Sequence, residues 1–144
     1  MSKRNLITIV LSVSLVVFFA CWQVNAQTGK VVKTISFDGG NCQLYELVKN
    51  SMLAPANIKE NKKAFMFRLK CSLKQNTGAD KLSVLYNKGE FVSSDGKLYK
   101  ASVSAVKWEN DDVAIYSLIV AIPNDVDVET LKFVYNNQVL LLNK

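Results

Sequence analysis

The side chains that could carry out chemistry in this 144-residue chain are cysteines, carboxylates and lysines, because the sequence contains no histidine. Histidine is the commonest general base and a common metal ligand, and it usually activates serine or cysteine nucleophiles. The six glycines are scattered and form no phosphate-binding loop. Asp111 could pair with Asp125 or Asp127 as in a glycosidase, although any β protein offers such pairs. We therefore expect a protein that is not an enzyme and needs no cofactor.

Cys42 and Cys71 are the cysteines most suited to a structural role. In an oxidising compartment, two cysteines most simply form one disulfide bond. The loop they would close spans about 30 residues, which the chain-entropy model values at about 3–4 kcal/mol. Two buried free thiols are the alternative. A zinc site is a poor alternative, because no histidine completes the ligand set.

Basic side chains gather between residues 59 and 74. If residues 65–73 form a strand, Arg68, Lys70 and Lys74 share its solvent face and could contact an anionic glycan, an acidic protein or a membrane surface. An ordinary solvated strand face is the simpler interpretation. Nucleic acid is not expected, because Phe65 and Phe67 would point inward and leave no aromatic platform between the charges.

The acidic side chains fall in two loops that flank the apolar run 113–122. A strand of that length spans about 30 Å, so the two loops should lie at its opposite ends. Asp125, Asp127 and Glu129 alternate and could supply three oxygen ligands to calcium, although they do not match the EF-hand spacing. We expect solubilising loops and no metal, with calcium at these three residues as the weaker alternative.

The first 26 residues have the pattern of a secretory signal peptide. Lys3 and Arg4 precede an apolar run over 6–20, and Val24 and Ala26 place suitable residues before a cleavage point. The run is shorter than the ~20 residues that span a bilayer. A retained anchor, or a lipoprotein signal with Cys21 as the lipidated residue, is the alternative. We expect cleavage, one domain over residues 27–144 with no transmembrane segment, and a secreted, periplasmic or cell-surface location.

The rest of the chain has the pattern of a β protein. The run 65–73 alternates strictly, with Phe65, Phe67, Leu69, Cys71 and Leu73 on the face that also points Cys71 inward. Residues 42–52 fit either a helix or a strand, and we favour a strand. Residues 50–63, which include Pro55, are expected to form a long loop. The other predicted strands are 31–37, 82–86, 90–93, 98–108, 113–122, 131–135 and 139–142.

Turn residues separate these strands at two places in particular. Asp95-Gly96 is a strong hairpin signal, and Asn136-Asn137-Gln138 is a plausible final turn. Seven to nine short antiparallel strands in a domain of this size indicate a sandwich or a barrel.

The segment 90–99, with Asp95-Gly96 followed by Tyr99, resembles a hairpin of a family of bacterial extracellular immunoglobulin-like domains of unknown function. It is also similar to the secreted immunoprotective β-sandwich antigen of mycobacteria. A second match is the strand that ends in Ile122-Pro123 and is followed by Leu131-Lys132-Phe133. The resemblance implies an all-β, immunoglobulin-like β-sandwich outside the cell, and it carries over no active site. Leu118 stands where antibody-type domains have their second cysteine.

Together these features predict an exported, non-catalytic module that binds a protein or glycan ligand through its surface. The alternative is a secreted inhibitor or protective protein that blocks an extracellular enzyme. The ligand and the oligomeric state are not specified by any of these patterns.

Overall fold

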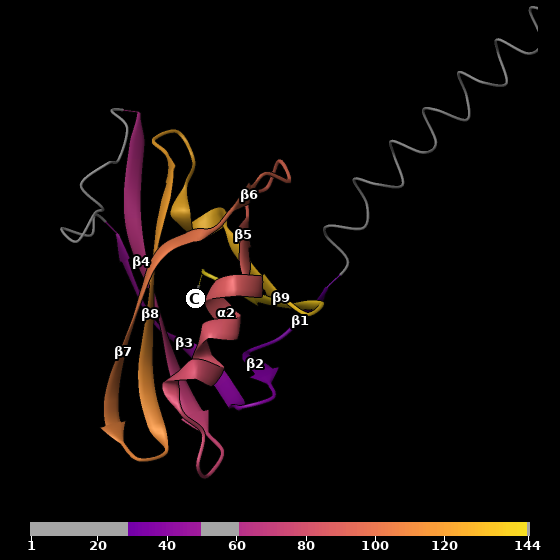
Figure 1. Ribbon diagram of the computed structural model, residues 1–144. Helices are drawn as coiled ribbons and strands as arrows, with labels where there is room; N and C mark the ends of the chain where they lie inside the picture. Colours follow the sequence, from indigo (N-terminus) through magenta and orange to yellow (C-terminus); the bar gives the residue numbers. More distant parts are fainter. Residues whose placement is uncertain (1–28, 50–60, 144) are drawn as a thin grey trace, which may run out of the picture.

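A computed structural model describes residues 29–49 and 61–143, which form two β-sheets packed face to face (Figure 1). Sheet A has the order β1 (Lys30–Val31), β10 (Gln138–Leu141), β9 (Lys132–Tyr135), β5 (Glu90–Val92) and β6 (Leu98–Tyr99). Sheet B has the order β2 (Thr34–Phe37), β3 (Gly40–Lys49), β4 (Lys62–Leu73), β8 (Val113–Pro123) and β7 (Ala101–Asn110). The predicted all-β sandwich is therefore confirmed. The predicted signal segment, with Cys21, lies outside the described residues.

β4 forms the centre of sheet B and carries the alternation that the sequence predicted. Phe65, Phe67, Leu69 and Cys71 are fully buried between the sheets, and the strand pairs with β3 on one side and β8 on the other. β8 is buried on both faces along most of its length, which accounts for its nearly continuous apolar sequence. β4 and β8 therefore form the buried centre of sheet B, against which β3 and β7 pair on either side.

Four phenylalanine rings join the two sheets. Phe91 of β5 lies 5.5 Å from Phe65, 5.2 Å from Phe67 and 5.0 Å from Phe133, measured between ring centroids. The first two contacts are edge-on, which suits the charge distribution of aromatic rings. Because Phe65 and Phe67 belong to sheet B and the other two to sheet A, this cluster sets how the sheets face one another.

Cys42 and Cys71 form a disulfide bond, as predicted. They are paired residues on β3 and β4, so the bond joins neighbouring strands of one sheet. Both residues are completely buried. The bond thereby fixes the register of β3 against β4.

The predicted strand over residues 82–86 is wrong. The chain forms a 3-10 helix, η1 (Ala79–Leu82), followed by a short helix, α2 (Ser83–Lys88). Leu82 and Leu85 are both completely buried, because a helix brings residues three apart to one face whereas a strand would separate them. The backbone N–H of Gly89 donates to the carbonyl of Leu85 and ends the helix.

Two predicted single strands each divide between the sheets. Residues 31–37 begin as β1 in sheet A and continue as β2 in sheet B, and residues 98–108 divide in the same way into β6 and β7. A bulge between Ala101 and Val103 also turns these two side chains to opposite faces of sheet B, whereas residues two apart in a regular strand share a face. The described residues thus form ten strands rather than seven to nine.

β1 pairs with β10 in parallel, so the expectation of purely antiparallel pairing is also wrong.

The β5–β6 and β9–β10 hairpins form where the turn residues predicted them. Gly96 adopts φ 81°, and Asn136 and Asn137 adopt φ 44° and 59°, backbone values that glycine and asparagine tolerate best. The strand favoured for residues 42–52 is confirmed as far as Lys49, where β3 ends. β4 begins at Lys62, so the last two residues of the loop predicted for residues 50–63 belong to this strand. Residues 50–60 lie outside the described part.

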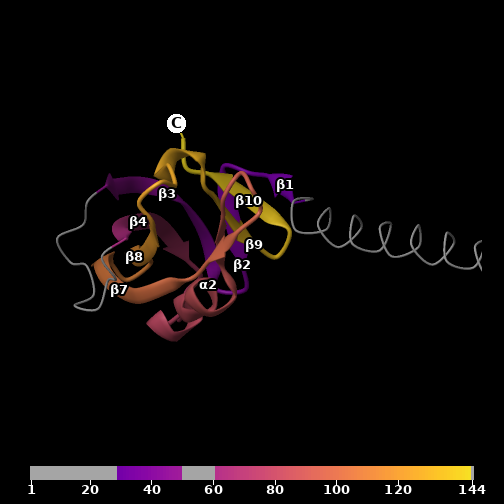
Figure 2. The ribbon, with the colours of Figure 1, turned by 90° about the horizontal axis from the view of Figure 1, so that it is seen from above.

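The two sides of the sandwich differ. Seen from above, α2 lies beside β7 at one side, and the C-terminal end lies beside β3 at the other (Figure 2). The hydroxyl of Tyr86, on α2, donates to the carbonyl of Ser102, on β7. Within the described residues, no helix is long and apolar enough to cross a membrane.

Candidate functional site

Strand β3 has a free edge over its second half. β2 pairs with β3 only over Gly40–Gln43, whereas β4 pairs with it as far as Lys49. Among the described residues, no strand pairs with the outer edge of β3 over residues 44–49. The backbone groups on this edge therefore have no partner strand in the part of the chain described.

In sheet A, the edge strand β1 ends next to the free edge of β3. β1 pairs with β10 only at Gln138 and Val139, and in the described residues Leu140 and Leu141 pair only with β9. The free parts of β3 and β10 line two adjoining hollows that share Leu44 and Asn143. The two sheets thus leave their common side open here.

The two hollows together are named the seam groove. The first, of about 360 Å³, is lined by Leu44, Tyr45, Glu46, Leu47, Lys49, Glu129, Leu142 and Asn143. The second, of about 520 Å³, is lined by Val31, Val32, Lys33, Gln43, Leu44, Leu140, Leu141 and Asn143. Leucine and valine supply five of the eight residues that line this second hollow, which makes it the more apolar of the two.

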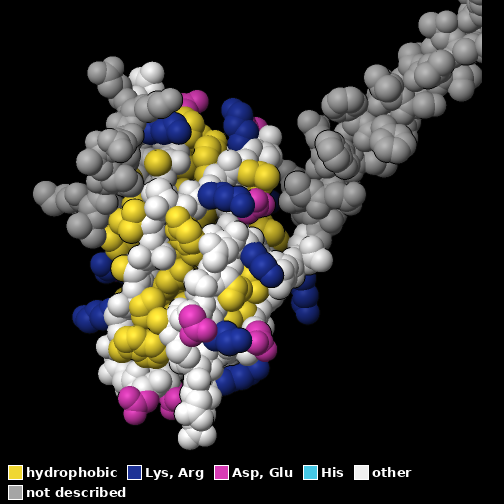
Figure 3. Space-filling model, in the orientation of Figure 1, with side chains coloured by type: hydrophobic (Ala, Val, Ile, Leu, Met, Phe, Trp, Pro, Cys, Tyr) yellow, Lys and Arg dark blue, Asp and Glu magenta, His cyan; other side chains and the backbone are white. Residues whose placement is uncertain are grey.

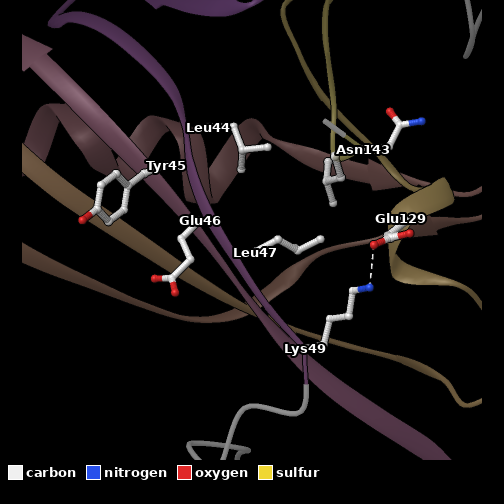
Figure 4. A pocket seen from close by; sticks show the side chains of 8 residues that line it. Leu44, Tyr45, Glu46, Leu47, Lys49, Glu129 and Asn143 are labelled. Atoms are coloured by element: carbon white, nitrogen blue, oxygen red, sulfur yellow. Dashed lines mark hydrogen bonds and ion pairs between the residues drawn. The ribbon is translucent and has the colours of Figure 1, made fainter.

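A β-bulge shapes the wall that β3 contributes. The pairing of β3 with β4 shifts between Leu44 and Glu46, so one extra residue is accommodated there. As a result Leu44 and Leu47 point toward the C-terminal segment, while Tyr45 and Glu46 point to the other side (Figure 4). The bulge therefore places two leucines, three positions apart, on the same wall.

Charged side chains stand at the two ends of the seam groove. At one end the ammonium of Lys49 forms an ion pair with Glu129 at 2.5 Å (Figure 4), and this hydrogen bond raises the pKa of Lys49. At the other end Lys33 is exposed and forms no ion pair with another described residue. The positive charge at the Lys33 end is therefore available to a ligand.

A glutamine side chain joins the two sheets next to the Lys33 end. The amide nitrogen of Gln138, on β10, donates to the carbonyl of Ser36 at 2.8 Å, and the N–H of Ser36 donates to the amide oxygen of Gln138 at 2.7 Å. The side chain thus imitates a strand partner for β2 and closes the side of the sandwich where the groove ends.

Arg68 and Lys70, predicted to contact an anionic partner, both lie in ion pairs on the outer face of sheet B. Arg68 contacts Glu46 at 2.6 Å, and Lys70 contacts Glu109 at 2.8 Å. The hydrogen bond from Glu109 raises the pKa of Lys70. An anionic partner would have to compete with these two carboxylates.

Lys74, the third predicted contact, lies beyond the end of β4. Its ammonium donates to the backbone carbonyl of Asp38 at 2.7 Å, so it is separated from the strand face that carries Arg68 and Lys70. On the face of the molecule seen in Figure 3, basic and acidic side chains are interspersed. The three predicted residues are close in the sequence, but the structure does not bring them together in a single site.

Two of the three carboxylates proposed as a calcium alternative, Asp125, Asp127 and Glu129, have protein partners. Asp127 accepts a hydrogen bond from the N–H of Glu129 at the start of η2 (Val128–Thr130), and Glu129 pairs with Lys49. Within the described residues, no group of three or more cysteine, aspartate or glutamate side chains is arranged to hold a metal ion. The two acidic loops do lie at opposite ends of β8, as predicted.

Another hollow, of about 360 Å³, lies at the turn between β7 and β8 and is lined by Trp108, Glu109, Asn110 and Asp111. Trp108 is 42% exposed. The N–H of Asp112 donates to the side chain of Asn110 within the turn, so part of its polar lining is used to hold the turn. This hollow is more open than the seam groove and offers a less defined surface.

Sequence patterns did not predict the seam groove. Leu44 and Leu47 belonged to the segment 42–52, which fitted either a helix or a strand, and Leu141 belonged to the last predicted strand. The comparisons with known proteins add no further assignment: no family model matches the chain, and neither the curated proteins nor the solved structures include a significant match.

Proposed function

We propose that this protein is an exported, non-catalytic binding module and that the seam groove is its contact surface. The observation that carries this proposal is that β2 and β1 stop pairing beside the same two hollows. Leucines line both hollows, and the second is also lined by two exposed apolar side chains, Val31 at 61% and Leu141 at 38% exposure. An apolar concave surface with a few polar groups is the usual form of a binding site.

Two features support export. The disulfide bond between Cys42 and Cys71 is typical of proteins that fold in an oxidising compartment. The N-terminal sequence has the three parts of a secretory signal. A frame held by a disulfide bond also suits a protein that presents a binding surface outside the cell.

The order of the strands supports an immunoglobulin-like type of sandwich. The order β10-β9-β5-β6 in sheet A corresponds to strands G, F, C and C′ of that fold, and β2-β3-β8-β7 in sheet B corresponds to A, B, E and D. The difference is β4, which lies between β3 and β8. The disulfide bond also differs, because it lies within one sheet instead of between two.

The proposed function is tested by two exposed leucines at opposite sides of the sandwich. Leu141 lines the seam groove, and Leu98 is 52% exposed on β6, at the far edge of sheet A. Purified wild-type protein, Leu141→Glu and Leu98→Glu are used to retain partners from the native extracellular fraction. We expect Leu141→Glu to lose the partner and Leu98→Glu to keep it. Equal retention by all three would contradict the groove as contact surface.

The anionic-partner proposal for Arg68, Lys70 and Lys74 is tested in the same assay. A triple variant with glutamate at the three positions should still retain the partner if the seam groove is the contact surface. Loss of retention by the triple variant, with normal retention by Leu141→Glu, would favour the basic residues instead.

A further inference from the structure

We infer that the seam groove takes an extended peptide segment of another protein, which adds as a strand to the free edge of β3. This inference rests on the proposed function and specifies its ligand class. It follows from the backbone edge, the spacing of the apolar side chains and the charges at the two ends of the groove.

The backbone edge is the first argument. Over residues 46–49, beyond the bulge, alternate residues of β3 direct their N–H and C=O groups away from β4, and no other described strand pairs with this edge from residue 44 onward. Such a row of groups is a template for an added strand, which supplies main-chain hydrogen bonds that do not depend on ligand sequence. A small molecule or a sugar would satisfy few of these groups.

The apolar walls are the second argument. Leu44 and Leu47 point into the groove from β3 (Figure 4), and Leu140 of β10 and Leu142, just after that strand, line it from the opposite side. Because side chains alternate along a strand, every second side chain of an added segment would enter this apolar space and the others would face water. The ligand is therefore apolar at alternate positions.

The end charges are the third argument. Lys49 is already neutralised by Glu129, whereas Lys33 at the opposite end forms no ion pair with another described residue. A carboxylate on the ligand, from an acidic side chain or a chain terminus, would complete this pair. The groove is thus suited to a segment with an acidic group at the end that meets Lys33.

A second copy of this chain is a poorer occupant. The bulge between Leu44 and Glu46 interrupts regular pairing, and in self-pairing both copies would bring a bulge to the same interface. Bulges are one of the devices by which edge strands avoid pairing with their own kind. A different segment, whose sequence can follow the bulge, does not meet this obstacle.

The test uses a displayed library of random peptides about ten residues long, the upper length of an ordinary strand. The library is selected on the disulfide-bonded protein and counter-selected on Leu141→Glu. We expect the selected peptides to carry apolar residues at alternate positions and an acidic group at one end. Binding should protect backbone amides of β3 between residues 44 and 49 from hydrogen exchange.

Backbone methylation of a selected peptide separates strand addition from simple apolar contact. Methylating the amides that face β3 should abolish binding, and methylating the alternate amides should leave it unchanged. Leu141→Glu should weaken binding by at least tenfold, which corresponds to about 1.4 kcal/mol. Lys33→Glu should weaken it about two- to fivefold, as for an exposed ion pair, and Leu98→Glu should have no effect.

The outcomes distinguish the two proposals. If the native partner is retained through Leu141 but the selected peptides show no alternation and tolerate methylation at every position, strand addition is wrong and the groove remains the contact surface. If neither native partner nor peptide depends on Leu141, both proposals fall. If gel filtration shows that the protein dimerises and the dimer protects residues 44–49, a second copy is the occupant and this inference is overturned.

Discussion

The side-chain amide of Gln138 forms two hydrogen bonds with the backbone of Ser36, so that a residue of sheet A serves as partner to the edge strand of sheet B. The pair lies where the N-terminal strands pass from one sheet to the other. Beyond it, neither β1 nor β2 continues along the edges, and the seam groove begins. The N-terminal segment that contains β1 and β2 therefore closes one part of this side of the sandwich and leaves the seam groove open.

Removing this amide should loosen the closed part. We expect Gln138→Leu to lower the free energy of unfolding by about 1–2 kcal/mol, because two hydrogen bonds are lost. Urea denaturation measures the effect. The exposed Gln75 serves as control, since Gln75→Leu should change stability by less than about 0.5 kcal/mol. Equal stability of both variants would show that the Gln138–Ser36 pair contributes nothing.

Loss of the disulfide bond should have a larger effect. Cys42 and Cys71 are separated by 29 residues, and a loop of that length is worth about 3–4 kcal/mol in the chain-entropy model. The double variant Cys42→Ala, Cys71→Ala should lose that amount in urea denaturation. Thiol labelling of the unfolded, unreduced protein should modify neither Cys42 nor Cys71. Labelling of both would contradict the bond.

The ring cluster between the sheets should be the most sensitive part of the core. Phe91 contacts three other phenylalanine rings and is completely buried. We expect Phe91→Ala to cost about 3–5 kcal/mol, and Phe91→Leu to cost less because it leaves a smaller cavity. Thermal and urea denaturation of both variants give the comparison. A loss below about 1 kcal/mol for Phe91→Ala would mean that the rings do not hold the sheets together.

The β5–β6 turn should give the protein a defined response to acid. The hydroxyl of Ser93 donates to Asp95, and Lys97 pairs with the same carboxylate. These contacts lower the pKa of Asp95 from 3.8 to about 2. A lowered pKa in the folded state stabilises the protein above the unfolded-state value, and this contribution is lost as pH falls through the folded-state value.

The window for this loss runs from about pH 4 down to about pH 2. Asp95→Asn, which cannot titrate, should show a smaller fall in melting temperature across that window than the wild type. Ser93→Ala, which removes the first of the hydrogen bonds, should show an intermediate fall. Parallel curves for all three proteins would rule out Asp95 as a source of acid sensitivity.

The sequence predicted the features that depend on local chemistry. The alternation of β4 and the turns at Gly96 and Asn137 were predictable because side-chain period and backbone φ are properties of a few neighbouring residues. The pairing of Cys42 with Cys71 was predictable because only two cysteines follow the predicted signal segment. The number of short strands indicated a sandwich or a barrel, and the resemblance to immunoglobulin-like domains implied the sandwich.

Other features depend on which strand lies next to which, and local patterns do not specify that. The pattern of residues 98–108 is the same whether the strand stays in one sheet or passes to the other at Lys100. In β3, the bulge after Leu44 brings residues three apart to one face, which is a spacing typical of a helix. Leu82 and Leu85 fit a short strand or a short helix equally well until their burial is known. The seam groove could not be predicted, because it exists only where the partner strands of β3 and β10 end.

The most direct test of the seam groove as contact surface is site-specific photo-cross-linking. A photoreactive phenylalanine analogue is placed at Leu141, inside the groove, or at Leu98, at the far edge of sheet A, and each protein is irradiated in its native extracellular fraction. We predict one discrete cross-linked product from position 141, reduced by a peptide selected for the groove, and none from position 98. The same product from both positions, or none from position 141, would contradict the account.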